Sequence, residues 1–363
     1  MKQNKKKKSK ICFFVGDMSK NGGTERVSSI IANELLDRGY QIIFLSYKKC
    51  DKSFYFLNSE IKIYSLFDME EKGYFKRKIR PYINLYKFVK KANIDVMIDV
   101  DIILSLYTIP IKILCGIKNI SWEHFNFSNQ RVKNRVRARK LAGYFSDAIV
   151  TLNKRDLENY KKNLNRIKRI DYIYNPAIVE NANVTTLKNN IAISVGRLNY
   201  SKGFDNLLKI WKLVEEKNKN WKLLIIGDGE ERDNLKKIIN EYKLQNVFLL
   251  PFQKNIEYYY ENASIYVMTS RSEGFPMVLL EAQKKGLPII SFDCETGPSE
   301  IVIDGRNGYL IKQNNLYEFA NKLLEIMNDN KKIIEFSKNA IKDSERFELK
   351  QIVNKWVELL ETL

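Results

Sequence analysis

The sequence predicts an α/β protein with two domains, and three observations support this prediction. The chain has 363 residues, which is long for a single hydrophobic core and sufficient for two. Short apolar runs alternate with amphipathic helical patterns, stop at a polar stretch over 180–190, and start again at Ile191. The net charge of +19 lies in residues 1–175, with 36 Lys and Arg against 17 Asp and Glu, whereas residues 176–363 hold 26 of each. We therefore expect two domains with different partners.

The composition narrows the class of protein. A chain that is 44% hydrophobic and 29% charged is typical of a globular fold. The four cysteines are far apart and form no C-x-x-C motif, which predicts reduced thiols in a cytosolic protein without a zinc or disulfide framework: Cys12, Cys50, Cys115 and Cys294. The single histidine, His124, excludes a site with several histidine ligands.

The first half opens with an expected strand over Lys10–Val15, a loop over 16–23 and a helix over Thr24–Arg38. Gly22 and Gly23 would allow an anion to approach backbone amides at the start of this helix. Taken alone, a Gly-Gly pair favours a plain turn. The other elements expected in this half are strands Gln41–Ser46, Ile61–Tyr64, Asp95–Val100, Ile117–Trp122, Ser146–Leu152 and Arg169–Tyr174, and a helix over Lys154–Leu164.

Two stretches of the first half are strongly basic. Residues 72–91 interleave Lys and Arg with Tyr and Phe, and we expect Pro81 to break this helical pattern in two. In one interpretation the aromatic side chains pack inward and the charges face water. In the other, the stretch lies on anionic lipid. Both interpretations stay open for 72–91, and a solvated helix face is the plainer interpretation of the second basic stretch, 130–140.

Polar residues follow two of the expected strands of this half. Asp99 and Asp101 form an Asp-x-Asp motif that is able to hold a metal ion, but an Asp at a strand end commonly caps the next helix, and we favour the cap. Glu123 and His124 follow the next strand, at the edge where open α/β sheets bind ligands. A lone histidine is nevertheless more often structural.

The second half restarts with a strand over Ile191–Val195, a loop over 196–203 and a helix over Phe204–Glu216. Arg197 and Lys202 lie on this glycine-bounded loop. Charge-assisted hydrogen bonds from such residues to phosphate contribute ~1.5–3 kcal/mol each. Taken singly, either Arg197 or Lys202 could equally be a loop side chain whose charge is exposed to solvent.

A second loop carries two carboxylates. After an expected strand over Ala263–Met268, the chain makes a glycine turn and enters a helix for which Pro276 suits the first position. Glu273 precedes this helix, and Glu281 lies about two turns along it. Taken alone, Glu273 and Glu281 are most simply interpreted as carboxylates exposed to solvent. The remaining expected elements are strands Trp221–Ile226, Val247–Leu250 and Pro288–Phe292, and helices Leu316–Asn328, Lys331–Lys342 and Phe347–Leu360.

Together these motifs resemble those of the retaining glycosyltransferases of family 4. The Glu-x7-Glu pattern with Gly-Phe-Pro after Glu273 is similar to the family signature, and the Gly-Gly-x-Glu-Arg and Gly-Arg-x4-Lys-Gly patterns match at Gly22 and Gly196. The resemblance implies the GT-B fold, in which two Rossmann-like domains face each other across a cleft and the last helix packs back on the first domain. It places the domains at 1–175 and 176–345, with the returning helix in 346–363.

The resemblance also implies roles for particular residues. Arg197, Lys202 and the amides around Gly274, Phe275 and Pro276 would hold the donor diphosphate, and Gly22 and Gly23 would border it. Glu281 would accept from the ribose hydroxyls. The implied catalytic residues are Glu273, near the sugar, and His124, which would contact the sugar. We expect no metal and no cofactor.

The implied reaction is retaining transfer of a hexose or N-acetylhexosamine from a nucleotide diphosphate sugar, with a UDP-sugar preferred. The acceptor would be a polyprenyl diphosphate-linked saccharide in bacterial surface polysaccharide or glycan synthesis. No apolar run is long enough to span a membrane, so we expect a cytoplasmic protein whose basic first domain binds the anionic inner face of the cell membrane. The alternatives are a non-catalytic GT-B partner subunit and a basic nucleic-acid-binding protein, for which we find no recognised motif.

Overall fold

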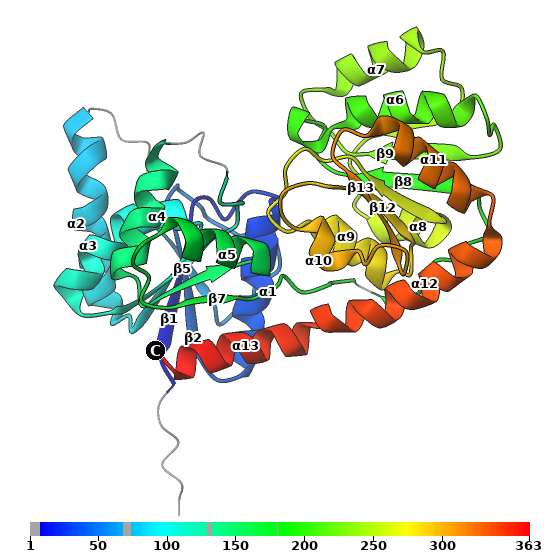
Figure 1. The fold of residues 1–363 in the computed structure, drawn as a ribbon. Coiled ribbons are helices and arrows are strands. Elements are labelled where there is room, and N and C mark those ends of the chain that lie inside the picture. The colour runs from blue at the N-terminus through cyan, green and yellow to red at the C-terminus, as the bar shows by residue number, and fades with distance from the viewer. Residues whose placement is uncertain (1–7, 68–73, 129–132, 180) are drawn as a thin grey trace, which may run out of the picture. The chain divides into compact units, whose positions relative to one another are not determined.

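The computed structural model describes residues 8–67, 74–128, 133–179 and 181–363. The chain forms two units, which we call unit 1 (Met1–Tyr174 with Ile352–Leu363) and unit 2 (Asn175–Gln351). Each unit has a central parallel sheet with helices packed against it (Figure 1). The predicted α/β class is confirmed in both.

Unit 1 is built on a sheet whose described strands follow the order β3-β2-β1-β4-β5-β6-β7. Their bounds are β1 Lys10–Val15, β2 Gln41–Ser46, β3 Lys62–Ser65, β4 Val96–Val100, β5 Lys118–Trp122, β6 Ala148–Thr151 and β7 Ile170–Tyr172. The helices are α1 Gly23–Asp37, α2 Tyr74–Ala92, the short 3-10 helix η1 Ile102–Leu104, α3 Ser105–Cys115, α4 Lys133–Phe145 and α5 Lys154–Asn163.

Unit 2 repeats the architecture with the strand order β10-β9-β8-β11-β12-β13. Its strands are β8 Ile191–Val195, β9 Lys222–Ile226, β10 Val247–Leu250, β11 Ile265–Met268, β12 Ile289–Asp293 and β13 Gly308–Lys312. The helices are η2 Tyr200–Lys202, α6 Phe204–Glu215, α7 Arg232–Glu241, α8 Ile256–Asn262, α9 Met277–Lys284, α10 Pro298–Ile301, α11 Leu316–Met327, α12 Asn330–Ser344 and η3 Glu345–Phe347.

Burial explains why these strands could be found in the sequence. The central strands of a parallel sheet are covered on both faces, so they appear as continuous apolar runs. β1 is buried from Ile11 to Val15, and every residue of β4 is buried. The edge strand β3 is different, since Lys62 and Tyr64 are exposed while the residues between and after them are partly buried.

The strand order places the expected binding loops at one point in each sheet. In unit 1 the chain moves outward from β1 to one side and then from β4 to the other, and in unit 2 it does the same from β8 and β11. Ligands of open α/β sheets bind beyond the carboxyl ends of the strands at such switch points. The loops that follow β1, β8 and β11 therefore contain most of the candidate site residues, while His124 follows β5 and Glu281 lies on α9.

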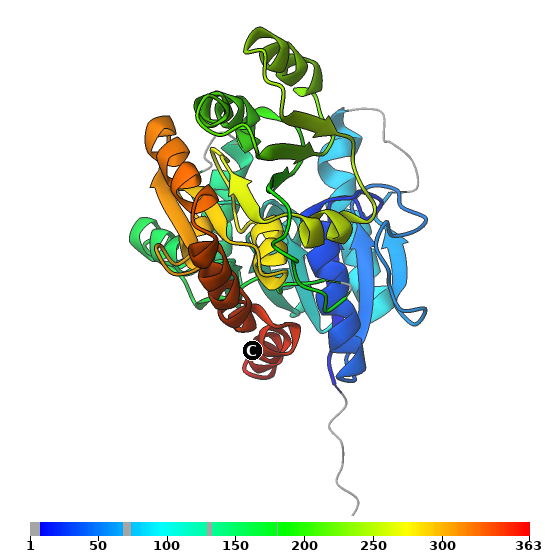
Figure 2. The same ribbon diagram turned by 90° about the vertical axis from the view of Figure 1, so that its right-hand side faces the viewer.

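The final helix, α13 (Leu349–Glu361), belongs to unit 1 from Ile352 onward, as the predicted fold requires. Trp356 is fully buried and packs edge-on against Trp122 with ring centroids 4.7 Å apart. Arg38, which ends α1, donates to Asn354 at 2.9 Å, and α13 accordingly lies beside α1 (Figures 1 and 2).

One expected break is wrong. Pro81 does not divide its helix, because α2 runs without interruption from Tyr74 to Ala92. Leu85 and Val89 of this helix are buried in the core of unit 1, and this packing offsets the ~3 kcal/mol that an interior proline costs. None of the described helices has the length and apolarity of a membrane span.

Candidate active site

In unit 2 the loops that follow β8 and β11 lie against each other. The Lys202 ammonium lies 2.7 Å from Oε1 of Glu273, and the Arg271 amide donates to the Ser201 carbonyl at 2.7 Å. The sequence predicted that both loops bear site residues, and the structure brings two of these residues into direct contact. A cation and a carboxylate thus share the switch point of this sheet.

The Lys202–Glu273 pair borders a small hollow. The Ser270 hydroxyl donates to the same Glu273 oxygen at 2.6 Å, and the Thr296 hydroxyl donates to the Glu273 main-chain carbonyl at 2.7 Å. Residues of β8, α6, β11, the loop after β11 and α9 complete the lining: Ser194, Val195, Phe204, Met268, Ser270 and Val278. Glu273 is therefore held in one orientation at the rim of a partly apolar recess.

Arg271 clamps the two loops together. Its guanidinium makes paired hydrogen bonds to the Asp205 carboxylate at 2.8 and 2.7 Å, and it also donates to the Tyr200 carbonyl. Paired bonds of this kind fix geometry as well as charge. Sequence reasoning missed this pair, although an arginine directly before the Ser272-Glu273 motif was a signal worth testing.

The backbones of the loops approach too closely for side chains at two glycines. A Cβ on Gly203 would lie 2.1 Å from the Thr269 carbonyl oxygen, and one on Gly227 would lie 1.9 Å from that of Gly196. Both residues also have positive φ, of 64° and 150°. Glycine is required at both positions, which explains the Gly-rich character of this edge.

Arg197 lies apart from this tight cluster. Its side chain is 72% exposed and makes a 3.3 Å ion pair with Glu230, which is itself largely exposed. Such surface pairs contribute little to stability. The Arg197 guanidinium is therefore able to leave Glu230 and bind another anion at little cost in stability.

The helix that carries Glu281 begins one residue later than expected. Pro276 is the N-cap residue with extended backbone, and α9 starts at Met277, so the predicted first helical position for Pro276 is wrong by one residue. Phe275 is buried against Phe347, and Gly274 is partly buried. Glu281 is only 5% exposed and accepts from the Tyr260 hydroxyl at 3.1 Å.

In unit 1 the predicted glycines lie at the start of α1. Gly22 is the N-cap residue and Gly23 the first helical residue. A Cβ on Gly22 would lie 2.2 Å from a carboxylate oxygen of Glu25, whose pKa is raised chiefly by burial. Asp101, beyond β4, contributes to that rise, so the loops after β1 and β4 are electrostatic neighbours.

The two residues of the Asp-x-Asp motif serve the fold of unit 1. Asp99 is fully buried and accepts from Thr108 at 2.6 Å and Asn119 at 2.9 Å. Burial raises its pKa to about 7 despite these hydrogen bonds. Asp101 caps η1 through the Ile103 amide, as the favoured interpretation predicted.

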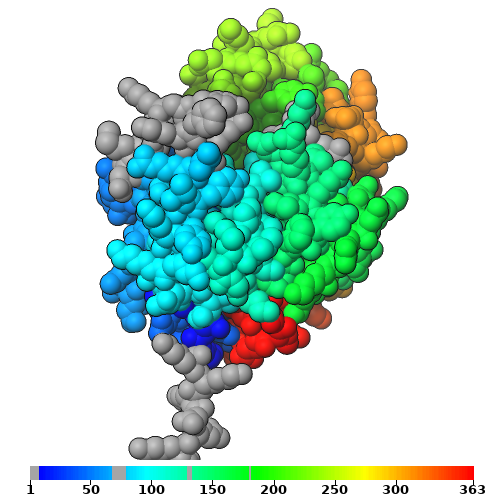
Figure 3. Space-filling model, turned by 90° about the vertical axis from the view of Figure 1, so that its left-hand side faces the viewer, coloured from blue at the N-terminus to red at the C-terminus, as the bar shows by residue number. Residues whose placement is uncertain are grey.

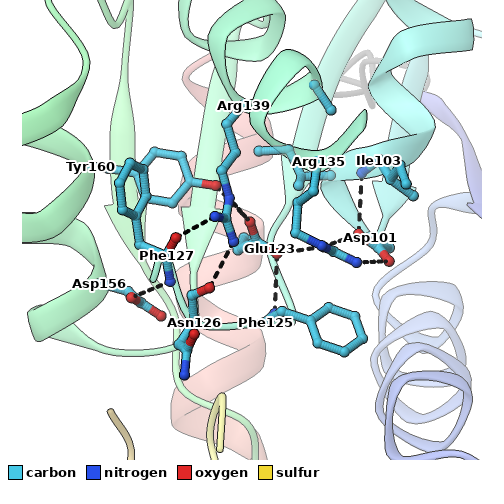
Figure 4. A network of polar contacts seen from close by, with 12 residues as sticks. Asp101, Ile103, Glu123, Phe125, Asn126, Phe127, Arg135, Arg139, Asp156 and Tyr160 are labelled. Carbon is cyan, nitrogen blue, oxygen red and sulfur yellow. Dashed lines mark hydrogen bonds and ion pairs between the residues drawn. The ribbon is translucent and has the colours of Figure 1, made fainter. Parts of the chain in front are cut away.

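Asp101 also ends a polar network that surrounds the strand-end residue Glu123 (Figure 4). Arg135 bonds both Asp101 oxygens at 2.6 and 2.9 Å and Oε1 of Glu123 at 3.0 Å. Arg139 donates to Oε2 of Glu123 at 2.8 Å, and Tyr160 donates to the same oxygen at 2.7 Å. These contacts stabilise Asp101 in a conformation with φ of 119°, which residues with side chains rarely adopt.

The same network fixes the loop around His124. Arg139 donates to the carbonyls of Asn126 and Phe127, and the Phe127 amide donates to Asp156 at 2.9 Å. Sequence reasoning treated the basic stretch 130–140 as a solvated face, and this is wrong for Arg135 and Arg139, which are buried. Gln130 and Arg131 lie outside the described residues. The signal was the i, i+4 spacing of two arginines on the helix face that also carries Ala138 and Ala142.

His124 itself is partly exposed, and its ring packs at a tilt against Trp122 with centroids 4.4 Å apart. Its Nε2 is buried and has no hydrogen-bond partner among the described residues. Burial lowers the pKa of the imidazole to about 4, although Asp101 acts in the opposite direction. At neutral pH His124 is therefore uncharged.

Comparison with known proteins identifies the family. The family model described as "Glycosyl transferases group 1" matches residues 179–343, which contain the whole unit 2 site. An uncharacterized glycosyltransferase of Haemophilus influenzae is 33% identical over 360 residues, covering 97% of this chain and 99% of the relative. The chain is a group 1 glycosyl transferase.

Two other glycosyltransferases also match over nearly their full length. The amylovoran biosynthesis glycosyltransferase AmsD of Erwinia amylovora is 29% identical, covering 97% of this chain and 99% of the relative. A Campylobacter jejuni N-acetylgalactosaminyltransferase, named for a glycan on undecaprenol diphosphate, is 26% identical, covering 97% and 98%. The relatives are bacterial enzymes of polysaccharide and lipid-linked glycan synthesis.

Solved structures confirm the GT-B fold of this group 1 glycosyl transferase. HepE of Anabaena, in complex with UDP, superposes with a TM-score of 0.82 at 18% identity, covering 98% of this chain and all of HepE. The galactosyltransferase WaaB superposes with a TM-score of 0.79 at 23% identity, covering 98% and 100%.

Proposed function

We propose that this group 1 glycosyl transferase is a retaining enzyme of family 4. In this proposal it transfers a hexose or N-acetylhexosamine from a UDP-sugar to a polyprenyl diphosphate-linked saccharide in surface polysaccharide or glycan synthesis. The observation that carries the proposal is the contact between Lys202 and Glu273 at the switch point of unit 2. The UDP bound to HepE and the lipid-linked substrate in the name of the Campylobacter relative support the donor and acceptor classes.

The geometry suits departure of a nucleoside diphosphate. Negative charge grows on the leaving phosphate, and fixed cations lower the energy of the transition state most where that charge is greatest. Lys202 is pre-positioned at 2.7 Å from Glu273, so a donor phosphate competes for an ammonium that is already in place. Arg197, whose ion pair with Glu230 is exposed, supplies a second cation. Backbone amides around residues 274–276, other than Pro276 itself, which has no N–H, supply hydrogen-bond donors.

Three further side chains have roles in the proposal. Glu281, fixed by Tyr260, accepts from the ribose hydroxyls. Glu273 lies near the sugar and offsets the positive charge that develops on its ring. His124, which is neutral, contacts the sugar, and Gly22 and Gly23 keep the neighbouring loop free of side chains. With two cations available, the proposed mechanism requires no metal.

Calorimetric titration with UDP, GDP and ADP in the presence of chelator tests the donor site. We expect one nucleotide, UDP, to bind. Lys202→Ala and Glu281→Ala should each weaken binding about tenfold or more, since each removes a charge-assisted hydrogen bond. Lys209→Ala is the matched control, because Lys209 is exposed on α6 of the same unit and should have no effect. If no nucleotide binds with or without magnesium, or if all three variants behave alike, the proposed donor site is wrong.

We also propose that unit 1 binds the anionic inner face of the membrane through α2. Ile79, Ile83 and Tyr86 are exposed at helical spacing, with side chains 53%, 47% and 41% accessible. Arg80, Lys87, Lys90 and Lys91 are exposed around them. The side chains of 74–78, and Lys72, lie outside the described residues. Figure 3 shows the face of unit 1 that includes the described part of α2 and its neighbours in cyan and green.

This arrangement combines apolar groups that can enter the headgroup region with cations that are each worth ~1 kcal/mol at an anionic surface. We expect salt-sensitive co-sedimentation with anionic vesicles and weaker binding to neutral ones. Replacing Ile79 and Ile83 together with Ser should reduce binding, whereas Tyr317→Ser, at a more exposed position in unit 2, should not. Equal binding to both vesicle types would contradict the electrostatic part of the proposal.

A further inference from the structure

Unit 1 contains a group of aromatic side chains that belongs neither to the core nor to the open surface. Tyr47 lies 5.4 Å from Phe67 and 5.3 Å from Tyr107, and Tyr107 lies 5.6 Å from Tyr82, measured between ring centroids. All four residues are partly exposed and rest on the buried core of the unit. We call Tyr47, Phe67, Tyr82 and Tyr107 the aromatic platform.

The aromatic platform lies at the carboxyl edge of the sheet, beside the switch point. Tyr47 directly follows β2, and Phe67 is two residues beyond the end of β3. Tyr107 is on the first turn of α3, which follows β4 through η1, and the Tyr82 hydroxyl reaches the neighbouring Leu106 carbonyl at 3.4 Å. Four elements distant in sequence therefore deliver aromatic rings to the edge where such sheets bind ligands.

Three hydroxyl groups accompany these rings. The pKa of Tyr107 is raised first by burial and then by the neighbouring Tyr47 side chain. Burial also raises the pKa of Tyr82. Both phenols therefore keep their protons at neutral pH, and their oxygens can accept hydrogen bonds.

A pyranose ring matches this combination of surfaces. It has an apolar face of C–H groups and a rim of hydroxyls, and partly exposed tyrosines offer a rigid apolar face with a polar tip. Pockets for small ligands generally combine aromatic walls with a few such polar groups. Lys48 and Lys49, both exposed, directly follow Tyr47, which places positive charge next to the platform and suits a saccharide that is joined to a diphosphate.

We propose that the aromatic platform is a binding site for a pyranose ring of the saccharide acceptor. This inference rests on the proposed function, because it supplies the second substrate of that reaction. It assigns the apolar contact with the sugar to the rings of Phe67 and Tyr107, and hydrogen bonds at the rim to the hydroxyls of Tyr47 and Tyr82. The donor site lies on other residues, in unit 2, and is measured separately.

The test is saturation-transfer NMR on the full-length protein. The probes are the methyl α-pyranosides of glucose, galactose, N-acetylglucosamine and N-acetylgalactosamine. We expect transfer to the ring protons of at least one probe, and a roughly tenfold loss of affinity in Phe67→Leu and in Tyr107→Leu, the order of effect seen when an aromatic contact is removed. Tyr47→Phe, which keeps the ring, should retain most of the binding.

Tyr64→Leu is the matched control. Tyr64 also contacts an aromatic ring, packing edge-on against Phe88 with centroids 5.3 Å apart, but it lies within the edge strand β3 and outside the platform. Its loss should leave pyranoside binding unchanged. UDP titration of each variant shows whether the donor site survives, and circular dichroism shows whether the variant is folded.

Three results would overturn the assignment to a sugar. The first is no transfer to any pyranoside from a protein that still binds UDP. The second is equal loss in Tyr64→Leu and Tyr107→Leu. The third is binding of farnesyl diphosphate or of a ten-residue oligothymidylate, but of no pyranoside, at the platform, which would indicate an isoprenoid or a nucleic-acid site instead. Failure to bind any nucleotide would be a failure of the proposed function and is distinguishable from all three.

Discussion

Removing the negative charge of Glu123 tests whether the network in Figure 4 holds unit 1 together. In Glu123→Gln the side chain keeps its size, but Arg139 and Arg135 lose the carboxylate that they contact at 2.8 and 3.0 Å. Arg139 is only 2% exposed, so its charge cannot be solvated in compensation. Removing one partner from a buried ion pair costs ~3–5 kcal/mol. For a unit of this size that corresponds to a fall of roughly 10 °C in the unfolding midpoint.

Tryptophan fluorescence can report on unit 1 alone. Trp122 and Trp356 belong to unit 1, whereas Trp211 and Trp221 belong to unit 2. In a background with Trp211→Phe and Trp221→Phe, we expect Glu123→Gln to lower the midpoint of the remaining signal.

Tyr160→Phe is the reference variant against which the destabilisation by Glu123→Gln is compared. It removes one hydrogen bond of 2.7 Å to the same carboxylate and leaves the two arginines paired, at a cost of ~1.5–3 kcal/mol. If Glu123→Gln lowers the midpoint by less than Tyr160→Phe does, buried charge pairing does not control this network and our reasoning fails.

Three further changes test other parts of the structure. Burial raises the pKa of Asp99 to about 7, so between about pH 4 and 7 the folded state binds a proton that the unfolded state lacks. The stability that this proton contributes is lost as the pH rises. In urea unfolding, Asp99→Asn should therefore lower the free energy of unfolding more at pH 5 than at pH 8. Trp356→Ala should destabilise unit 1 by ~3–5 kcal/mol, since the ring is fully buried against Trp122, and calorimetry should show the unit 2 transition unmoved. Gly203→Ala should destabilise unit 2 by at least ~1–3 kcal/mol and weaken UDP binding, because its Cβ would meet the Thr269 carbonyl at 2.1 Å; an unchanged melting temperature would contradict this.

Much of the fold could be predicted because most strands are short, buried and bounded by turn residues. The expected strands at Lys10–Val15 and Ile191–Val195 agree with β1 and β8 at both ends. Sequence reasoning did not find α3, because its sequence has a single charged residue, Lys112, and an internal Pro110, and so resembles no amphipathic pattern. The helix contacts α2 and α4 as well as the sheet. It also missed β13, a five-residue strand directly after a tight turn.

The candidate site was predictable where its residues are close in sequence. The loop with Arg197 and Lys202 and the loop with Glu273 are continuous motifs, and local pattern suffices to find them. The pairs that hold these loops are different, since Arg271 and Asp205 lie far apart in the chain and only tertiary folding brings them together. Composition likewise cannot separate buried Arg135 and Arg139 from their basic neighbours, because the distinction depends on which helix face meets Glu123.

The return of α13 to unit 1 has a consequence for biosynthesis. A ribosome makes the seven strands of unit 1 first, then all of unit 2, and only afterwards the segment from Ile352 that supplies Trp356. At a synthesis rate of ~5–20 residues per second, Trp356 is made about ten seconds or more after Trp122, the residue against which it packs. Unit 2 is complete before unit 1, even though unit 1 begins the polypeptide. A nascent chain halted shortly before Ile352 would already carry the Lys202–Glu273 pair, while its first sheet still exposed an apolar surface to chaperones.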